Sequence, residues 1–407
     1  MQHSCIKGNA CPGARGLSRL HQCGNLRGTA SASPIGRHPF IKWLAARSFQ
    51  LSSPISGRRN ALDLAIQRIR GGRSEWPFAG GARRAAVMWF RNDLRVHDNE
   101  ALAIANRDSS SLLPVYCFDP REYSSSGNGI NSTGPYRAQF IVDAVMELRN
   151  SLRAIGSDLI VRIGKPEEVL TDLAKKVGAS KVFCHSEVTY EEDLTEKQVA
   201  AALKVEDIQL KASWGSTLYS PDDLPFKLGD LPATHGEFRS KVASLAVKQP
   251  EKAPAQLKGK PVGSQGISSG DIPTLAQLGL QPLSNIPGAP KCRGGESEGL
   301  AQLNRLLSRT SMKAGPGSNI SAAFSNEVSP WLALGCLSPR RMYAEVQARQ
   351  ASSNPTVVSL MHAELIWRDF FRFTAKKYAS ESIIRSSAQQ EAPAVASASP
   401  RLSMAFA

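Results

Sequence analysis

Between residues 85 and 213, short apolar segments alternate with longer segments of helical period. This alternation predicts βαβ units, in which the strands form a parallel sheet and the helices cover its two faces. The five predicted strands lie at residues 85–90, 112–118, 159–163, 181–185 and from 208–210 onward. The predicted helices between them lie at residues 99–106, 135–155, 166–177 and 190–203. The expected fold class is therefore α/β.

The same arrangement predicts where ligands would bind. In an open parallel sheet, they bind outside the carboxyl ends of the strands. No G-x-G-x-x-G follows the first predicted strand, so a nicotinamide-dependent dehydrogenase lacks its usual sequence support. The chain also has no P-loop, no G-x-S-x-G motif and no His and Cys at metal-ligand spacing.

Most of the net positive charge lies in the first 74 residues. The whole chain has a net charge of +15, and residues 1–74 hold twelve Lys or Arg and one acidic residue. The remaining 38 basic and 34 acidic residues leave no strong electrostatic footprint for nucleic acid. The leader is rich in Ser, Gly and Ala and lacks an apolar core, which is typical of an organelle transit peptide. We expect a chloroplast protein, with a mitochondrial location or a disordered basic tail as the alternatives.

Two protein classes are disfavoured by the rest of the composition. No segment approaches the roughly 18–20 apolar residues of a membrane-spanning helix, so we expect no membrane association. Seven cysteines are present, three of them in the leader, and the other four show no C-x-x-C spacing. Such cysteines favour buried free thiols in a reducing compartment over zinc ligands or disulfides.

The pattern becomes helical in the second half of the chain. Ser329-Pro330 and Ser338-Pro339 each place a hydroxyl at a predicted N-cap before a proline in the first turn, and a long helix is predicted at 356–378. Five regions are expected: a leader at 1–74, an α/β domain at 84–243, a Pro- and Gly-rich linker at 244–293, a partial helical domain at 294–379 and a disordered tail at 380–407.

One candidate site lies at the start of a predicted helix. The amides at a helix N-terminus are unpaired and the helix dipole is positive there, so this position can bind phosphate. The alternative is plain capping of the helix by Ser329. The candidate phosphate-binding residues are Ser325, Asn326, Glu327, Val328 and Ser329.

A second candidate site lies on the long helix. Glu364, Trp367, Arg368 and Phe371 are spaced at i, i+3, i+4 and i+7, which predicts that they share one helix face. Large aromatic rings beside a carboxylate and a guanidinium suggest the wall of a pocket for a flat, charged ligand. Core packing with one ion pair fits the same spacing.

Two further groups of polar residues follow predicted strands. Residues 91–98 hold two Arg, two Asp and one His. They could bind a ligand at the carboxyl end of the first strand, but a clamp that joins two domains through salt bridges is the favoured interpretation. Glu187 follows the fourth strand, where it could accept hydrogen bonds from a heterocycle or be a solvated loop acid.

Six segments in this order resemble motifs of the photolyase/cryptochrome family. They are WFRNDLRVHDN at 89–99, GPYRAQF at 134–140, GKPE at 164–167, GGE at 294–296, SPWLALGCLSPR at 329–340 and ELIWRDFFR at 364–372. One such match is weak, but six in order are unlikely by chance. The sequence is most similar to the DASH-type cryptochromes of class I and to the short plant blue-light photoreceptors related to photolyase.

The resemblance implies a Rossmann-like antenna domain followed by a helical domain that binds FAD. It implies that residues 325–329 contact the FAD phosphates and that Arg368 lies beside the flavin. It further implies that Glu364 and Trp367 face pyrimidine dimers in DNA as the catalytic pair, and that Glu187 holds a folate antenna. Repair in the family proceeds by electron transfer from the light-excited reduced flavin to a flipped-out dimer.

Two departures from the family pattern affect these expectations. Ser325 and Glu327 replace the usual Thr and basic residue, and an acid beside a diphosphate is unfavourable unless it points away. The helical domain is expected to be truncated, because the sequence stops before the helices that complete the flavin site. We therefore expect weak FAD binding or a protein partner that completes the site. The alternatives are a flavin-free interaction protein and an antenna-binding protein, and repair and signalling both remain open.

Overall fold

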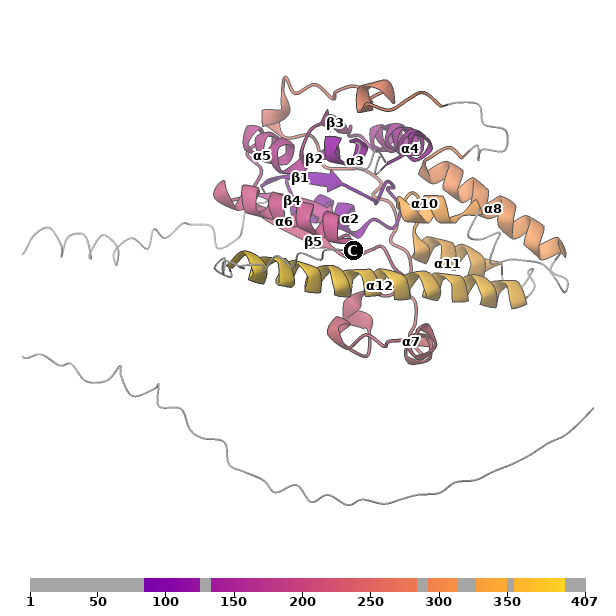
Figure 1. Ribbon diagram of the computed structural model, residues 1–407. Helices are drawn as coiled ribbons and strands as arrows, with labels where there is room; N and C mark the ends of the chain where they lie inside the picture. The colour runs from indigo at the N-terminus through magenta and orange to yellow at the C-terminus, as the bar shows by residue number, and fades with distance from the viewer. Residues whose placement is uncertain (1–83, 125–132, 284–291, 314–326, 350–354, 392–407) are drawn as a thin grey trace, which may run out of the picture. The chain divides into compact units, whose positions relative to one another are not determined.

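The computed structural model describes residues 84–124, 133–283, 292–313, 327–349 and 355–391 (Figure 1). These residues belong to one compact unit that begins at Pro77. The predicted leader at 1–74, the candidate residues Ser325 and Asn326, and residues 392–407 lie outside the described part of the chain.

A five-stranded parallel sheet forms the centre of this unit, with strand order β3-β2-β1-β4-β5. The predicted α/β class is therefore confirmed, and each predicted strand is present within a few residues of its expected bounds. The strands are β1 (Ala85–Phe90), β2 (Ser111–Phe118), β3 (Ile160–Ile163), β4 (Lys181–His185) and β5 (Gln209–Ser213).

Helices cover both faces of the sheet, because alternate side chains along each strand point to opposite faces. On β1, Val87 and Trp89 pack towards the helices at 166–176 and 190–205, whereas Met88 and Phe90 pack towards the helix at 135–154 and the C-terminal helices. The first helices are α2 (Glu100–Asp108), α3 (Pro120–Tyr123), α4 (Pro135–Ala154), α5 (Pro166–Lys176) and α6 (Tyr190–Val205). The later helices are α7 (His235–Val242), α8 (Glu296–Lys313), α10 (Ser329–Ala333), α11 (Pro339–Ala348) and α12 (Pro355–Glu391).

The helix starts test the capping predictions. Ser338 caps α11 by accepting a hydrogen bond from the Arg341 N–H, with Pro339 in the first turn, as predicted. At α10 the prediction is wrong, because Val328 occupies the N-cap position without a side-chain cap and Ser329 is the first helical residue. Val328 is fully buried, so packing of its side chain fixes the start of this helix one residue earlier than the hydroxyl pattern indicates.

The region between the two predicted domains is packed against the sheet. Short 3-10 turns interrupt residues 244–283, namely η3 (Val262–Ser264) and η4 (Ala276–Leu278). The Leu112 N–H donates to the Gly259 carbonyl at 3.0 Å, and the Val161 N–H donates to the Ser269 carbonyl at 2.8 Å. Four leucines of this region lie in the main core: Leu257, Leu275, Leu278 and Leu280.

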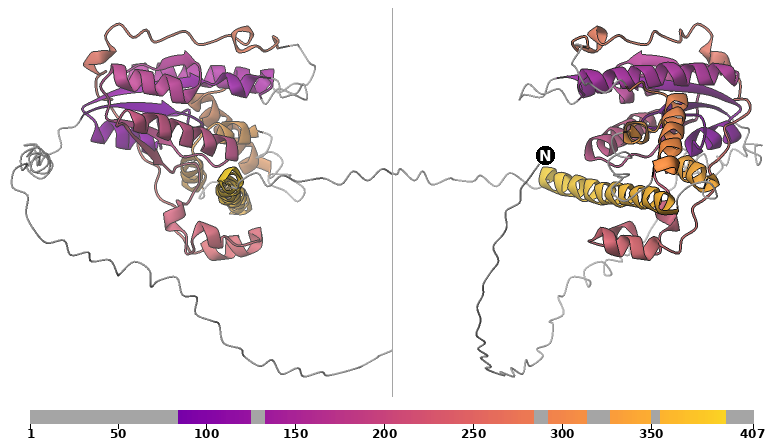
Figure 2. Two further views of the ribbon diagram at one scale, coloured as in Figure 1. Left: turned by 60° about the vertical axis from the view of Figure 1, so that its left-hand side comes forward. Right: turned by 90° about the vertical axis from the view of Figure 1, so that its right-hand side faces the viewer.

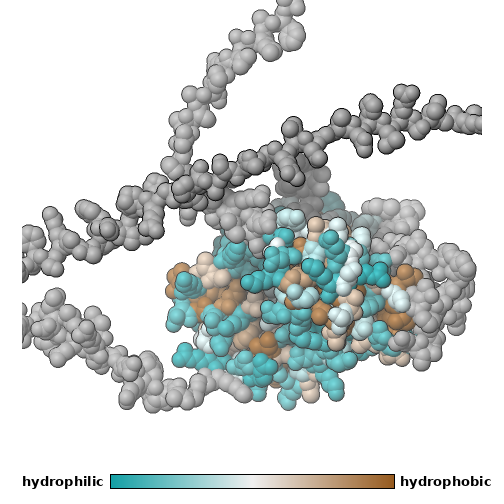
Figure 3. All heavy atoms as spheres, turned by 90° about the horizontal axis from the view of Figure 1, so that it is seen from below, coloured by the Kyte–Doolittle hydropathy of each residue, from teal (hydrophilic) through white to brown (hydrophobic). Residues whose placement is uncertain are grey.

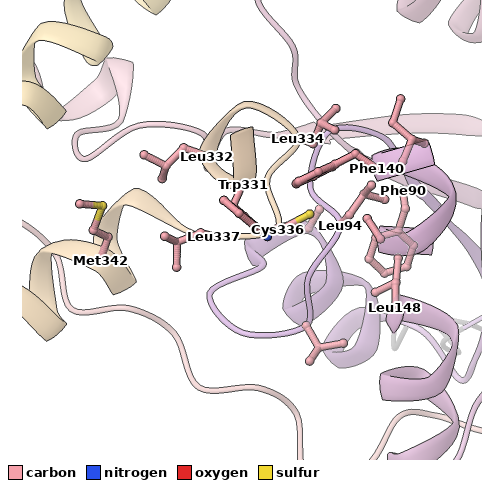
Figure 4. Packing of buried hydrophobic residues seen from close by; sticks show 14 of the residues in the cluster. Phe90, Leu94, Phe140, Leu148, Trp331, Leu332, Leu334, Cys336, Leu337 and Met342 are labelled. Carbon is pink, nitrogen blue, oxygen red and sulfur yellow. The ribbon is translucent and has the colours of Figure 1, made fainter. Parts of the chain in front are cut away.

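The C-terminal helices share that core with the sheet. Trp331 of α10 packs edge to face on Phe140 of α4, with ring centroids 5.4 Å apart, and donates through Nε1 to the Arg293 carbonyl. Figure 4 shows Trp331 and Leu334 on the side of Leu94 and Phe140 of α4, with Leu332 on the side of Leu337 and Met342. The two predicted domains are thus joined by one continuous hydrophobic core.

The long helix α12 lies below the sheet in the first view, with α7 on its far side in every view (Figures 1 and 2). It extends to Glu391, beyond the predicted helix end at residue 378. Among the described residues, no helix has the length and apolar character required to cross a membrane.

Candidate functional site at the junction of sheet and long helix

The long helix presents aromatic side chains outward and charged side chains inward. Trp367 and Phe371 are about half exposed, and their rings meet edge to face with centroids 5.2 Å apart. Arg368 follows Trp367 by one position, and its guanidinium is directed to backbone carbonyls of other elements. The shared face predicted for Arg368, Trp367 and Phe371 stays a prediction.

Arg368 is held by backbone carbonyls. Its Nη1 donates to the Ser216 carbonyl at 2.5 Å and its Nη2 donates to the Leu332 carbonyl at 3.0 Å. Burial, and then repulsion from Arg372, lowers the pKa of Arg368 to about 9. The guanidinium thus links α12 to α10 and to the loop after β5, and this partly buried cation would be stabilised further by an anion.

The neighbouring Asp369 is fully buried. Its Oδ2 accepts hydrogen bonds from the backbone N–H groups of Leu218 and Tyr219, at 2.9 and 3.4 Å. Its Oδ1 has no hydrogen-bond partner within the described residues. Burial raises the pKa of Asp369 to about 7, and nearby Arg368 opposes this shift.

A histidine positions the Trp367 ring. His235, the first residue of α7, meets Trp367 edge to face with ring centroids 4.5 Å apart. Burial and the nearby Arg239 lower the pKa of His235, whereas Glu364 raises it. His235 therefore favours the neutral form, and its interaction with Glu364 places that carboxylate near the outward aromatic face.

Glu187 is not a solvated loop acid, because only 1% of its surface is exposed. Its Oε1 accepts from the Asn92 N–H and its Oε2 accepts from Arg372 Nη2, both at 3.2 Å. Burial opposes ionisation, but His185, Arg372 and Arg91 outweigh it and lower the pKa of Glu187 to about 2. Lys376 also donates to the Glu187 carbonyl and to Asp193. The carboxylate therefore connects the end of β4 to α12.

The polar segment after β1 forms the clamp favoured by its sequence. Arg95 donates to the Gly335 carbonyl at 2.9 Å, and Asp98 pairs with Arg340 of α11 at 2.8 Å. Asp98 also accepts a hydrogen bond from Ser338. His97 Nδ1 lies 2.9 Å from Glu296 at the start of α8. These contacts tie the sheet to α8, to α11 and to the turn after α10, which confirms the clamp.

Only part of the predicted phosphate segment lies within the described residues. Glu327 accepts a hydrogen bond from Gln302 of α8 at 3.1 Å, so its carboxylate is oriented by that helix. Val328 is buried and Ser329 begins α10. Neither of the two sequence interpretations, phosphate cradle or Ser329 cap, accounts for the packing role of Val328.

A cavity of about 480 Å³ lies at the carboxyl ends of β1 and β2. Its lining contains aromatic rings such as Trp89 and Tyr116, three arginines (Arg91, Arg121 and Arg137) and four acids (Asp119, Glu122, Glu191 and Glu192). The Arg91 guanidinium lies 4.6 Å from the Trp89 ring centroid. Topology predicted a ligand site at this edge of the sheet. Much of the lining comes from α4 and α6, where Arg137 lies in the GPYRAQF motif, but the sequence analysis assigned no ligand contact to that motif.

The four cysteines of the described residues are free thiols, as their spacing predicted. Cys117, Cys184 and Cys336 are buried free thiols, and Cys292 is a half-buried one. Burial raises the pKa of Cys336 to about 12. Over the described residues, no group of three or more His, Cys, Asp or Glu side chains is arranged to hold a metal ion.

Comparison with known proteins adds independent evidence. The DNA photolyase family model matches residues 86–256. Blue-light photoreceptor PHR2 of Arabidopsis thaliana is 47% identical over 322 residues, covering 74% of this chain and 72% of that protein. Cryptochrome DASH, chloroplastic/mitochondrial, of the same plant is 38% identical over 302 residues, covering 72% of this chain and 52% of that protein.

A solved structure supports the same relationship. The Synechocystis sp. PCC6803 cryptochrome superposes with a TM-score of 0.63 at 36% identity, covering 72% of this chain and 62% of that one. The chain therefore spans nearly three quarters of PHR2 but only about half to three fifths of these cryptochromes. With its parallel sheet, its clamp to the C-terminal helices and these relatives, the chain belongs to the photolyase/cryptochrome family.

Proposed function

We propose that the chain is a light-responsive flavoprotein that binds FAD beside α12 and acts in blue-light sensing or in the repair of pyrimidine dimers. The observation that carries this proposal is that α12 holds the partly buried Arg368 cation on its inner side and half-exposed Trp367 and Phe371 rings on its outer side. Family membership supplies the choice of FAD as the flat, anionic ligand. When bound, FAD supplies light-driven electron transfer.

The residues of this chain fit one side of an FAD site. Arg368 is a partly buried cation that contacts carbonyls, so an anionic ligand nearby would favour its charged form. Gln302 orients the Glu327 carboxylate, which reduces the conflict between that acid and a diphosphate. Residues 325–329 would then approach the phosphates, and α12 would flank the ring system.

Glu364 and Trp367 are the proposed DNA-facing pair. A half-exposed indole offers a ring face on which a flipped-out base can stack, an interaction that is worth about 1–3 kcal/mol per base in nucleic-acid complexes. His235 fixes the orientation of that indole. Glu364 would accept a hydrogen bond from the base edge.

The exposure of Trp367 and Phe371 affects the affinity that we expect for FAD. Rings that stay half exposed contribute only part of the apolar area that an enclosed ligand site buries. We therefore infer weak FAD binding by this chain alone, or a protein partner that covers the open side.

The flavin proposal is tested by purifying the chain from its native source and recording its visible absorption. We expect the visible absorption bands of a bound flavin. Trp367→Ala should lower light-dependent repair of dimer-containing DNA by about tenfold or more, whereas Val205→Ala, at another exposed apolar position, should not. A colourless protein that gains no flavin on reconstitution would refute the proposal.

A second candidate function rests on the cavity of about 480 Å³ in the α/β domain. Its lining combines aromatic rings with three arginines and four carboxylates, which suits a flat heteroaromatic ligand with hydrogen-bond donors and acceptors, such as a folate or flavin antenna. Glu187, the residue expected to hold a folate, is not among the lining residues, and its carboxylate is bound to Arg372. We therefore place this ligand in the cavity and not at Glu187.

Filling the cavity tests this second function. Thr195 lines it from α6, and Thr195→Trp should abolish binding of 5,10-methenyltetrahydrofolate or FMN, measured by fluorescence titration, while the fold is retained. Thr171→Trp on α5, outside the lining, serves as the control. Unchanged binding in Thr195→Trp would exclude the cavity.

We also infer an organelle location from the basic leader and from the relative named chloroplastic/mitochondrial. Deleting residues 1–72 should abolish import into isolated chloroplasts or mitochondria. Continued import of the shortened chain would contradict this inference.

A further inference from the structure

The outward face of α12 has the spacing of one side of a coiled coil. Four large side chains are exposed along it: Leu360 (37%), Trp367 (48%), Phe371 (50%) and Tyr378 (57%). Together with Glu364 and Thr374 they occupy six positions separated alternately by four and three residues. This is the spacing of heptad positions a and d, whose side chains pack between those of a second helix. We call these six residues the α12 seam.

The seam is complementary to itself in an antiparallel arrangement. With a two-fold axis beside residue 369, Leu360 of one copy faces Tyr378 of the other, and Trp367 faces Phe371. Glu364 then faces Thr374. Each pair occurs twice, as required in an isologous interface, where residue i meets j and j meets i.

Charge also favours the antiparallel arrangement. Glu364 is the one ionisable carboxylate of the seam. Parallel pairing would place two Glu364 carboxylates opposite each other inside an apolar contact, which is unfavourable. Antiparallel pairing places Glu364 beside Thr374 of the second copy, with Lys377 one turn along that helix. The carboxylate thus meets a hydroxyl and a nearby cation.

The exposed area indicates how strong such a pairing can be. Because aromatic side chains bury about 150–250 Å² each when fully enclosed, the four exposed side chains leave about 400 Å² of apolar surface on each copy. The total of about 800 Å² is less than the roughly 1,200–2,000 Å² of stable interfaces. Viewed from below, apolar groups interrupt a mostly hydrophilic surface (Figure 3). The area therefore suits a weak, concentration-dependent dimer.

We propose that the α12 seam is the interface of a weak antiparallel homodimer of this chain. The interface covers Glu364 and Trp367, which the proposed function assigns to DNA. Dimer formation and DNA binding would therefore exclude each other, and the monomer fraction would set the amount of chain available for DNA. The pairing itself does not depend on flavin binding, so the two proposals can fail separately.

Cysteine cross-linking tests the pairing and its register. The full chain carries Cys5→Ser, Cys11→Ser, Cys23→Ser and Cys292→Ser, which leaves only the buried thiols Cys117, Cys184 and Cys336. The double variant Leu360→Cys with Tyr378→Cys is made in this background, and the purified protein is treated with a short bis-maleimide. Positions 360 and 378 lie about 27 Å apart along one helix, so the reagent joins them only between copies. We expect a covalent dimer from the double variant.

Matched variants define the outcomes. Each single cysteine variant should stay monomeric, because an antiparallel pairing separates like positions. Leu360→Cys with Phe371→Cys, displaced by one heptad or about 10 Å, should cross-link at least about tenfold less. Cross-linking of the single variants would indicate parallel pairing and overturn the proposal. Equal cross-linking of both double variants, or none, would overturn it as well.

Sedimentation equilibrium tests the dimer without cross-linking. At about 100 µM, a concentration at which contacts of roughly −5 kcal/mol become half occupied, the natural sequence should contain dimer. Phe371→Asp should raise the dissociation constant by about tenfold or more, and Val262→Asp, at an exposed apolar position away from α12, should leave it unchanged. A natural chain that is monomeric at this concentration refutes the proposal, as does equal weakening by both variants.

Discussion

The two sides of α12 differ in how their side chains are satisfied. On the inner side, Arg368, Arg372 and Lys376 donate to carbonyls or carboxylates of the sheet region and of α10. On the outer side, Trp367 and Phe371 leave about half of their surface exposed. Burying a charge is costly unless it is hydrogen-bonded, so the inner side fixes the position of the helix. The outer side keeps apolar surface available for binding.

The largest expected effect is a difference in stability between substitutions at two phenylalanines of α12. Phe373 is fully buried and stacks on Trp214 with ring centroids 5.7 Å apart, so Phe373→Ala should lower the free energy of unfolding by about 3–5 kcal/mol. Phe371→Ala, on the outer side, should lower it by less than about 1 kcal/mol in dilute solution. Urea unfolding measures both, and equal losses would remove the distinction between the two sides.

The next effect concerns the clamp between sheet and helices. Arg340→Met leaves the buried Asp98 carboxylate without its guanidinium partner, which should cost about 3 kcal/mol of unfolding free energy. Arg305→Met removes an exposed pair with Glu298 and should cost at most about 1 kcal/mol. If urea denaturation gives similar values for the two variants, the clamp contributes no more than a surface pair.

An effect of comparable size should appear in the stability of the fold at acid pH. The pKa of Glu187 is lowered from 4.5 to about 2 in the folded chain, so its contribution is present above about pH 5 and is lost as the pH falls towards 2. The shift corresponds to about 3 kcal/mol. In Glu187→Gln, unfolding free energies measured between pH 2 and 5 should lose this part of their pH dependence. An unchanged slope would mean that Glu187 does not titrate in this way.

The smallest effect belongs to His97, whose partly exposed ring pairs with Glu296. The Glu296 hydrogen bond raises the pKa of His97 above 6.5. The ion pair therefore stabilises the fold below about pH 6.5, and this contribution is lost as the pH rises through the folded-state pKa. For a partly exposed pair we expect about 0.5 kcal/mol. The stability difference between the natural chain and His97→Gln should shrink between pH 6 and 8, and a difference that grows would reverse this assignment.

The local pattern of apolar and capping residues was sufficient to predict the strands and helices of the α/β part. Residues 85–90 and 181–185 are the observed β1 and β4, and Asn99, at the start of a predicted helix, caps α2. Strong apolar runs and caps act within a few residues, so they can be read without knowing the fold. The clamp was also predictable, because opposite charges crowd into the eight residues that follow β1.

The spacing of residues along the chain could not predict contacts between residues that are distant in sequence. Helical period placed Arg368 near Trp367, but only the packed structure directs its guanidinium to carbonyls 152 and 36 residues away in sequence. Ser329 has the chemistry of a cap, yet burial of Val328 determines where α10 starts. Glu187 follows a strand as a loop acid would, but α12 covers it and supplies its cationic partner.

The sequence by itself determined the parallel sheet, the order of its helices and the family, because these depend on residue pattern along the chain. The tertiary structure decided which side of α12 is buried, which charges are paired and where the cavity lies. These properties depend on burial, and burial of a side chain is set by all the elements packed around it rather than by its neighbours in sequence.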